Sequence, residues 1–142
     1  MPDPLRILFV CTGNSARSQM AEGFARHLGQ GRVEALSAGM EPSRLNPYAV
    51  KVMRERGIDI SGQQSKAFDW DLAQRMDMVV TVCGNADERC PVLPSEVKRL
   101  HWPLEDPGAA TGYWLANAPA FAGSRLAAAT SRPPFIAWMA RA

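Results

Sequence analysis

Short apolar runs alternate along the chain with segments of helical periodicity. The continuous apolar run 7–10 is typical of a strand covered on both faces. After it, Met20, Phe24 and Leu28 recur at intervals of four, which places them on one face of a helix. Gly29 is typical of the residue at which such a helix ends. The pattern therefore predicts a buried strand followed by an amphipathic helix.

Similar signals continue beyond this first unit. The segment 33–37 alternates like a short strand. Asn46 followed by Pro47 predicts a helix with a side-chain cap and a proline in its first turn. From this helix we expect Val50 and Met53 to face the core. The remaining predicted elements are a short helix over 69–75 and strands over 78–82 and 99–102.

The order of these elements predicts the topology. Strands that alternate with helices form parallel β-α-β units with right-handed crossovers. We therefore expect residues 1–142 to form one α/β domain, a three-layer sandwich whose helices flank a central parallel sheet of about four strands. Ligands bind such sheets at the carboxyl ends of the strands. Cys11, Cys83 and the segment after Trp102 all follow predicted strands, so we expect them to converge.

Composition excludes several classes of protein. A hydrophobic content of 46% suits a globular core, and a net charge of +2 gives no patch for nucleic acid or a membrane surface. No apolar run reaches the roughly 18 residues of a membrane span, and the N-terminus lacks the pattern of a secretory signal. Three cysteines without an export signal indicate reduced thiols rather than a disulfide framework. We expect a cytoplasmic monomer.

Candidate chemistry lies directly after the first strand, where Cys11 begins a short polar loop that leads to Arg17. The thiolate is the reactive form of cysteine, and a helix N-terminus and a neighbouring arginine stabilise it. Gly13 and Asn14 tolerate unusual backbone angles, so the loop can turn successive N–H groups towards a tetrahedral oxyanion. This order predicts a thiol that attacks a bound oxyanion. The alternative is a buried structural cysteine at a strand end.

Other polar residues fit structural roles. Ser15 or Ser18 can cap the helix that follows the loop. His27 lies near the C-terminus of that helix, where a cation interacts well with the helix dipole. His101 fits a packed or surface position in a strand. Asp106 precedes a proline, which is typical of a turn.

Three motifs follow one another along the chain, at residues 10–22, at residues 37–39 together with 79–91, and at residues 101–107. These motifs resemble those of the arsenate reductases that share the fold of the low molecular weight tyrosine phosphatases. The resemblance extends to about residue 112, and three motifs in order are far more specific than the cysteine loop alone.

The resemblance implies a role for each of five residues. Cys11 matches the nucleophile that attacks arsenate, and Arg17 matches the cation that binds its oxygens. Asp106 matches the general acid that protonates the leaving oxygen. Cys83 and Cys90 match the second and third cysteines of the thioredoxin-linked branch. The anion-binding loop corresponds to Thr12, Gly13, Asn14, Ser15, Ala16, Arg17 and Ser18.

The implied activity is reduction of arsenate to arsenite through a three-cysteine thiol–disulfide relay. Electrons would come from thioredoxin as the protein partner, with no bound cofactor and no metal. Two alternatives stay open: a low molecular weight protein tyrosine phosphatase, and an oxyanion sensor that uses the three thiols. Cys83 and Cys90 favour the reductase, because ester hydrolysis does not need them. An alternative for Cys83 and Cys90 is a buried cysteine at a strand end and a surface thiol. A zinc site is less favoured, because the three cysteines include no C-x2-C pair.

The relay sets a geometric requirement on residues 83–90. Seven residues of regular helix rise about 10.5 Å, whereas a disulfide needs Cα atoms within roughly 7 Å. We therefore predict that this segment bends or unwinds on oxidation.

Two features depart from the family pattern. Some members bind a potassium ion beside the anion loop; Asn14, Glu22 and Ser37 match its ligands, but Lys66 stands at the carboxylate position. An ammonium there would replace the ion's charge. The second departure is the segment 113–134, where the family pattern has an amphipathic helix that closes the domain. This segment contains three prolines, and each costs about 3 kcal/mol inside a helix.

Overall fold

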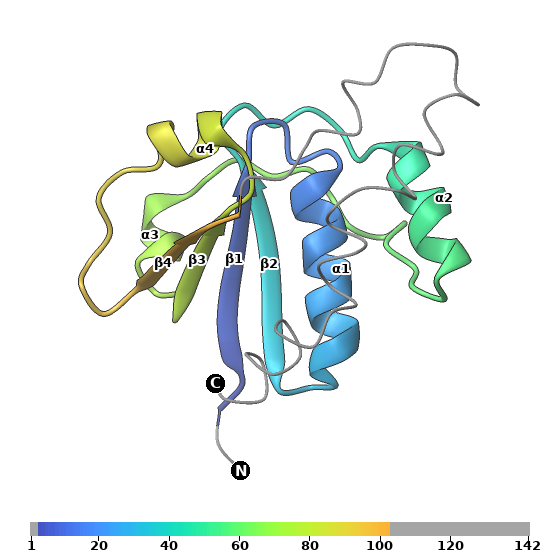
Figure 1. Cartoon of the computed structure of the whole chain (residues 1–142), viewed down its shortest axis with the longest axis horizontal. Helices are drawn as coiled ribbons and strands as arrows, with labels where there is room; N and C mark the ends of the chain where they lie inside the picture. Colours follow the sequence, from blue (N-terminus) through green and yellow to red (C-terminus); the bar gives the residue numbers. More distant parts are fainter. Residues whose placement is uncertain (1–2, 103–142) are drawn as a thin grey trace.

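A computed structural model shows an α/β fold and describes residues 3–102. The four strands form one parallel sheet in the order β2-β1-β3-β4, with helices beside it (Figure 1). The predicted fold class, a parallel sheet of about four strands flanked by helices, is confirmed. Asp106 and the segment 113–134 lie outside the described residues. The elements in chain order are β1 (Leu5–Cys11), α1 (Arg17–Gly29), β2 (Val33–Gly39), α2 (Pro47–Glu55), α3 (Trp70–Ala73), β3 (Met78–Thr81), α4 (Gly84–Arg89) and β4 (Lys98–His101).

The central strand is β1, which pairs with β2 on one side and with β3 on the other. Residues 7–10 are completely buried, as the apolar run predicts. In the register, Cys11 lies opposite Gly39 of β2, and Val10 lies opposite Thr81 of β3. The carboxyl ends of β1 and β3 are therefore neighbours. Both strands lead towards a cysteine, so the sheet places two thiols at the same edge.

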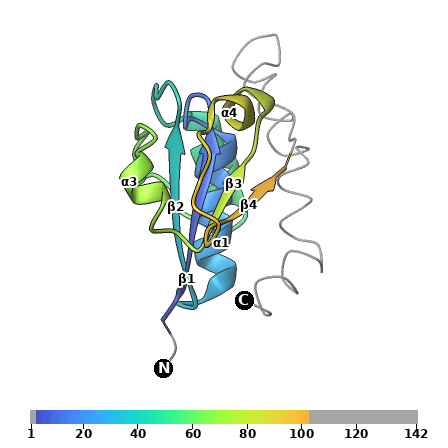
Figure 2. The same ribbon diagram turned by 90° about the vertical axis from the view of Figure 1, so that its left-hand side faces the viewer.

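Helix α1 packs against β1 and β2 (Figures 1 and 2), and α2 packs against α1 (Figure 1). The apolar face of α1 is buried through Met20 and Phe24, as its spacing predicts. Helix α2 begins as predicted, because the Asn46 side chain accepts a hydrogen bond from Tyr48 N at 2.8 Å. Its buried face differs slightly from the prediction, since Val50 is only half-buried. The residues that α2 buries in the core are Tyr48, Ala49, Val52 and Met53.

Strand β2 is longer than predicted and ends at Gly39 rather than at residue 37. Gly39 continues the ladder with Cys11, and its N–H donates to Lys66 O at 2.8 Å. Its carbonyl accepts from Phe68 N at 2.9 Å. Tertiary pairing on both sides therefore extends the strand through a glycine that sequence patterns treat as a break. Helix α3 is shorter than predicted, at four residues. No helix in the described part of the chain combines the length and the apolar character needed to cross a membrane.

Candidate active site

Cys11 is the last residue of β1, and its sulfur is enclosed by the loop that follows. The residue is only 3% exposed. Asn14 N donates to Cys11 Sγ at 3.1 Å, and Ser18 Oγ lies 2.8 Å from the same sulfur. Asn14 adopts a left-handed backbone with φ of 47°, a conformation that asparagine tolerates better than most residues. This conformation turns its N–H towards the sulfur.

The hydrogen bonds around Ser18 have a clear direction. Asn14 Nδ2 donates to Ser18 Oγ at 2.7 Å, which leaves the serine hydroxyl proton free to point at Cys11 Sγ. The prediction that Ser15 or Ser18 caps α1 is wrong. The N-cap is Ala16, and no side chain caps the helix. Ser18 instead provides a donor to the nucleophile, a role that the sequence pattern does not reveal.

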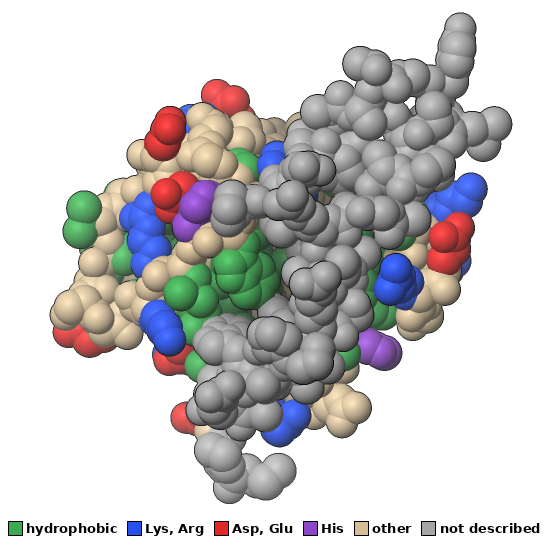
Figure 3. Space-filling view, in the orientation of Figure 1, with side chains coloured by type: hydrophobic (Ala, Val, Ile, Leu, Met, Phe, Trp, Pro, Cys, Tyr) green, Lys and Arg blue, Asp and Glu red, His purple; other side chains and the backbone are tan. Residues whose placement is uncertain are grey.

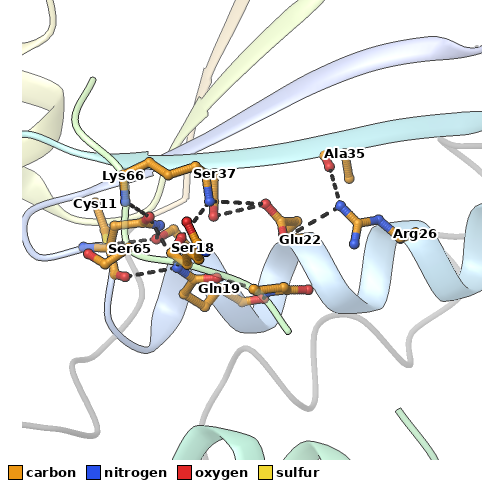
Figure 4. Close-up of polar contacts among 12 residues, drawn as sticks. Cys11, Ser18, Gln19, Glu22, Arg26, Ala35, Ser37, Ser65 and Lys66 are labelled. Carbon is orange, nitrogen blue, oxygen red and sulfur yellow. Dashed lines mark hydrogen bonds and ion pairs between the residues drawn. The ribbon is translucent and has the colours of Figure 1, made fainter. Parts of the chain in front are cut away.

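Two segments, helix α1 and residues 65–66, hold the loop through hydrogen bonds. Lys66 N donates to Asn14 Oδ1 at 2.8 Å, and Gln19 Nε2 donates to the same oxygen at 3.1 Å. The carbonyl of Gly13 accepts the hydroxyl of Ser65 at 2.9 Å. Figure 4 shows these side chains gathered around Cys11 at the start of α1. The nucleophile is therefore fixed by residues far apart in the chain.

Arg17 and Asp106 complete the predicted set of oxyanion-handling groups. Arg17 is the first residue of α1 and is half-buried, directly after the loop. A cation at this point suits binding of oxyanion oxygens. Asp106 lies outside the described residues.

Cys83 lies at the carboxyl end of β3 and caps α4. Its sulfur accepts from Ala86 N at 3.4 Å and lies 3.3 Å from Thr12 Oγ1. Asn85 Nδ2 donates to Thr12 Oγ1 at 2.9 Å, so the threonine proton is available to Cys83 Sγ. Two donors aimed at one sulfur suit an anionic nucleophile. The expected convergence is confirmed for Cys11 and Cys83, which are linked through a residue of the anion loop.

Cys90 lies at the opposite end of α4 and is 7% exposed. Burial raises the pKa of its thiol, and the guanidinium of Arg99 opposes that rise. The fold does not bring Cys90 to Cys83, because the six residues of α4 separate them. All three thiols are free. The alternative of a surface thiol does not hold for Cys90, which is buried.

A buried carboxylate lies behind the loop on α1. Burial raises the pKa of Glu22, while Lys66, Arg26 and the hydroxyl of Ser37 oppose the rise. Lys66 Nζ lies 3.8 Å from Glu22 Oε1, and Ser37 donates to that oxygen at 3.1 Å (Figure 4). The ammonium already supplies a positive charge beside Glu22. These residues therefore do not fit a potassium ion at this position.

Sequence reasoning placed Ser18 in the anion loop but missed its contact with the sulfur of Cys11. It missed Asn85 and Ser65 entirely; these two side chains donate to the loop oxygens of Thr12 and Gly13, and no periodicity or spacing marks them in the sequence. The ladder position of Gly39 against the loop was missed for the same reason.

Comparisons with known proteins find one matching family and several similar arsenate reductases. The family described as low molecular weight phosphotyrosine protein phosphatase matches residues 6–110. An arsenate reductase of Shouchella clausii is 55% identical over 106 residues, which make up 75% of this chain and 76% of that protein. The solved structure of an arsenate reductase in its oxidized state has a TM-score of 0.73 and 34% identity, covering 94% of this chain and 98% of that chain. A thioredoxin-dependent arsenate reductase of Corynebacterium glutamicum has a TM-score of 0.68 and 27% identity, covering 91% of this chain and 62% of that chain.

Proposed function

Since the chain belongs to the low molecular weight phosphotyrosine protein phosphatase family, together with the arsenate reductases that it resembles, we propose that it reduces arsenate to arsenite. We further propose that Cys11, Cys83 and Cys90 form a relay that thioredoxin regenerates, with the enzyme acting as a cytoplasmic monomer. One observation carries this proposal above all. A second sulfur, Cys83, contacts the same loop that encloses Cys11, through Thr12.

The first step is attack by the Cys11 thiolate on arsenic. An S–As bond forms, an As–O bond breaks, and the oxygen leaves as water after protonation. The donors from Asn14 and Ser18 hold the sulfur beneath the loop. Arg17 is assigned to the arsenate oxygens, and Asp106 is assigned to the leaving oxygen. Positioning of this kind is what converts a slow encounter into a fast step.

The second step passes two electrons to arsenic. Cys83 attacks Cys11 Sγ, an S–S bond forms, and the S–As bond breaks with its electron pair on arsenic. Arsenic(V) becomes arsenic(III) and leaves as arsenite. The logic is that of thiol–disulfide exchange, with arsenite as the leaving group.

The third step returns the nucleophile to its thiolate form. Cys90 attacks Cys83, a new S–S bond forms, and Cys11 leaves as the thiolate. Thioredoxin then reduces the Cys83–Cys90 disulfide. The Corynebacterium glutamicum relative is thioredoxin-dependent, which supports this choice of reductant.

Single-cysteine variants separate the steps. We expect Cys83→Ser to release no arsenite, because nothing can attack the adduct. Cys90→Ser should release a single arsenite per enzyme and then stop with a Cys11–Cys83 disulfide, detectable by mass spectrometry. The parental protein should turn over repeatedly with thioredoxin, thioredoxin reductase and NADPH. Parental turnover by Cys83→Ser with the same donor would refute the relay.

Phosphatase activity is the second candidate, and the oxyanion loop favours it because phosphate shares the shape and charge of arsenate. Hydrolysis of an aryl phosphate by Cys83→Ser at the parental rate, without arsenate reduction in the parental protein, would favour this alternative. Multiple turnovers of arsenate would exclude an oxyanion sensor.

A further inference from the structure

Helix α4 stands between the two cysteines that must pair in the third step. Cys83 is its N-cap and Cys90 is its C-cap. The helix rises about 1.5 Å per residue, so its ends lie too far apart for a disulfide, which needs Cα atoms within roughly 7 Å. Oxidation therefore requires α4 to unwind. Whatever holds α4 folded must oppose formation of the Cys83–Cys90 bond.

One arginine on the neighbouring strand holds the C-terminal half of α4. From β4, Arg99 Nη2 donates to the Asp87 carbonyl at 2.6 Å and to Asp87 Oδ1 at 3.2 Å. Its Nη1 donates to the carbonyls of Cys90 and Pro91 at 3.4 and 3.2 Å. A single guanidinium thus binds both the last turn of α4 and the two residues that follow it.

The carboxylate of Asp87 also accepts a hydrogen bond from the sheet. The buried hydroxyl of Thr81 in β3 donates to Asp87 Oδ1 at 2.9 Å and lies 2.8 Å from His101 Nδ1. A hydroxyl has one proton, so the imidazole must be the donor at Nδ1. The hydrogen bonds from Thr81 and Arg99 hold the pKa of Asp87 below its usual range. Figure 3 shows acidic, basic and histidine side chains gathered over α4 and β4.

We propose that Asp87 and Arg99 form a clamp that keeps α4 helical in the reduced protein and thereby sets the reduction potential of the Cys83–Cys90 pair. The proposal rests on the proposed function, because only the relay requires these two sulfurs to meet. Arg99 and Asp87 are positioning residues that touch neither substrate nor a reacting sulfur. The clamp stabilises the dithiol form relative to the disulfide, which makes the disulfide easier for thioredoxin to reduce.

The strength of the clamp lies in its hydrogen bonds rather than in its ion pair. The side chains of Arg99 and Asp87 are 32% and 36% exposed, so their charge attraction alone is weak. The guanidinium, however, reaches three carbonyls and a carboxylate at once, and unwinding must break several of these bonds together.

The test is a redox titration of the full chain carrying Cys11→Ser, in which Cys83 and Cys90 are the remaining thiols. The protein is equilibrated at pH 7 with mixtures of reduced and oxidised dithiothreitol, and each disulfide formed oxidises one dithiol and reduces one disulfide of the buffer. Burial raises the pKa of the Cys90 thiol and the guanidinium of Arg99 opposes that rise, so removing Arg99 does not favour the Cys90 thiolate, and the midpoint of the titration reports the clamp. We expect Arg99→Met to favour the disulfide by about tenfold, which is about 30 mV for a two-electron couple.

Matched variants make the result specific. Lys98→Met removes the same charge from the adjacent, exposed position of β4 and should leave the midpoint unchanged. Arg99→Lys keeps the charge without the forked donors and should give a smaller shift. Faster amide exchange over residues 84–89 in reduced Arg99→Met, but not in Lys98→Met, should accompany the change.

Thermal unfolding of both redox forms distinguishes a clamp from a general structural role. If Arg99 and Asp87 act as a clamp, removing the clamp destabilises only the reduced form. Equal destabilisation of both forms with an unchanged midpoint would overturn the proposal. If Arg99→Met does not fold, Asp87→Asn carries the same test. If the parental Cys11→Ser protein never forms a Cys83–Cys90 disulfide, the relay itself is wrong. A disulfide that forms with the same midpoint in every variant refutes the clamp alone.

Discussion

Substituting alanine for Gly39 tests whether the close approach of β2 fixes the anion loop. A Cβ at this position would lie 2.7 Å from Thr12 O, 2.8 Å from Asn14 N and 2.9 Å from Asn14 Cβ. Ordinary contacts begin at 3.4 Å, so the loop must move by about 0.7 Å to admit the methyl group. Two of the three atoms are backbone atoms of the loop, and no flexible side chain can absorb the displacement.

Two magnitudes follow from this displacement. Overpacking of this kind costs about 1–3 kcal/mol of stability, and at a urea dependence of roughly 2 kcal/mol per M the unfolding midpoint falls by about 1 M. The loop also carries the N–H of Asn14 that points at Cys11 Sγ. Because a shift of about 1 Å can reduce a rate on the order of 100-fold, we expect arsenate reduction to fall by roughly 10- to 100-fold.

The matched control is Gly62→Ala, because nothing lies within 4 Å of a Cβ at that position. Urea unfolding and the thioredoxin-coupled assay are measured for both variants. Gly62→Ala should behave as the parental protein within about 0.5 kcal/mol, as surface substitutions usually do. A Gly39→Ala protein with parental stability and parental kcat/KM would show that the ladder position does not constrain the loop.

Three further outcomes are expected. Thr12→Val removes the hydroxyl that faces Cys83 Sγ. Arsenite release in a rapid-quench assay should therefore slow by about tenfold while phosphate binding stays unchanged. An equal loss of arsenite release and phosphate binding would contradict this role of the hydroxyl. Activity should be the same in potassium and sodium salts, since Lys66 supplies the charge beside Glu22, and strong activation by potassium alone would refute it. Burial raises the pKa of Glu22 above its ordinary value of 4.5. The contribution of Glu22 to the free energy of unfolding is therefore complete below pH 4.5 and is lost as the pH rises through the raised pKa. The free energy of unfolding of the parental protein, compared with that of Glu22→Gln, should therefore fall over this pH range. A difference between the two proteins that does not change with pH would argue against the burial of Glu22.

The parts of the fold that depend on local patterns could be predicted from the sequence. The apolar run of β1 and the four-residue spacing on α1 each specify one element without knowledge of its neighbours. The Asn46–Pro47 cap is equally local, because the side chain bonds to a backbone group two residues away. The parallel topology followed from the order of the elements, and it placed Cys11 and Cys83 at one edge of the sheet.

The parts that depend on tertiary contact could not be predicted. Serine is a favoured residue type at a helix cap, yet Ser18 lies inside α1, where its oxygen accepts from Asn14 and its hydroxyl faces Cys11. The extension of β2 to Gly39 requires partners from β1 and from the segment after residue 65. Arg99 reaches the Asp87 carbonyl of α4 from twelve positions away, and no short-range pattern encodes that separation. In each case the deciding partner lies far along the chain.

The burial of Cys83 and Cys90 bears on how the protein responds to oxidants. The two residues are 6% and 7% exposed, so peroxide and alkylating reagents have little access to their sulfurs in the reduced fold. On the proposed cycle, α4 opens only as Cys83 and Cys90 become a disulfide, which does not progress to sulfinic or sulfonic acid as a free thiolate does. The same helix that delays pairing would thus shield the sulfurs from irreversible damage between encounters with substrate.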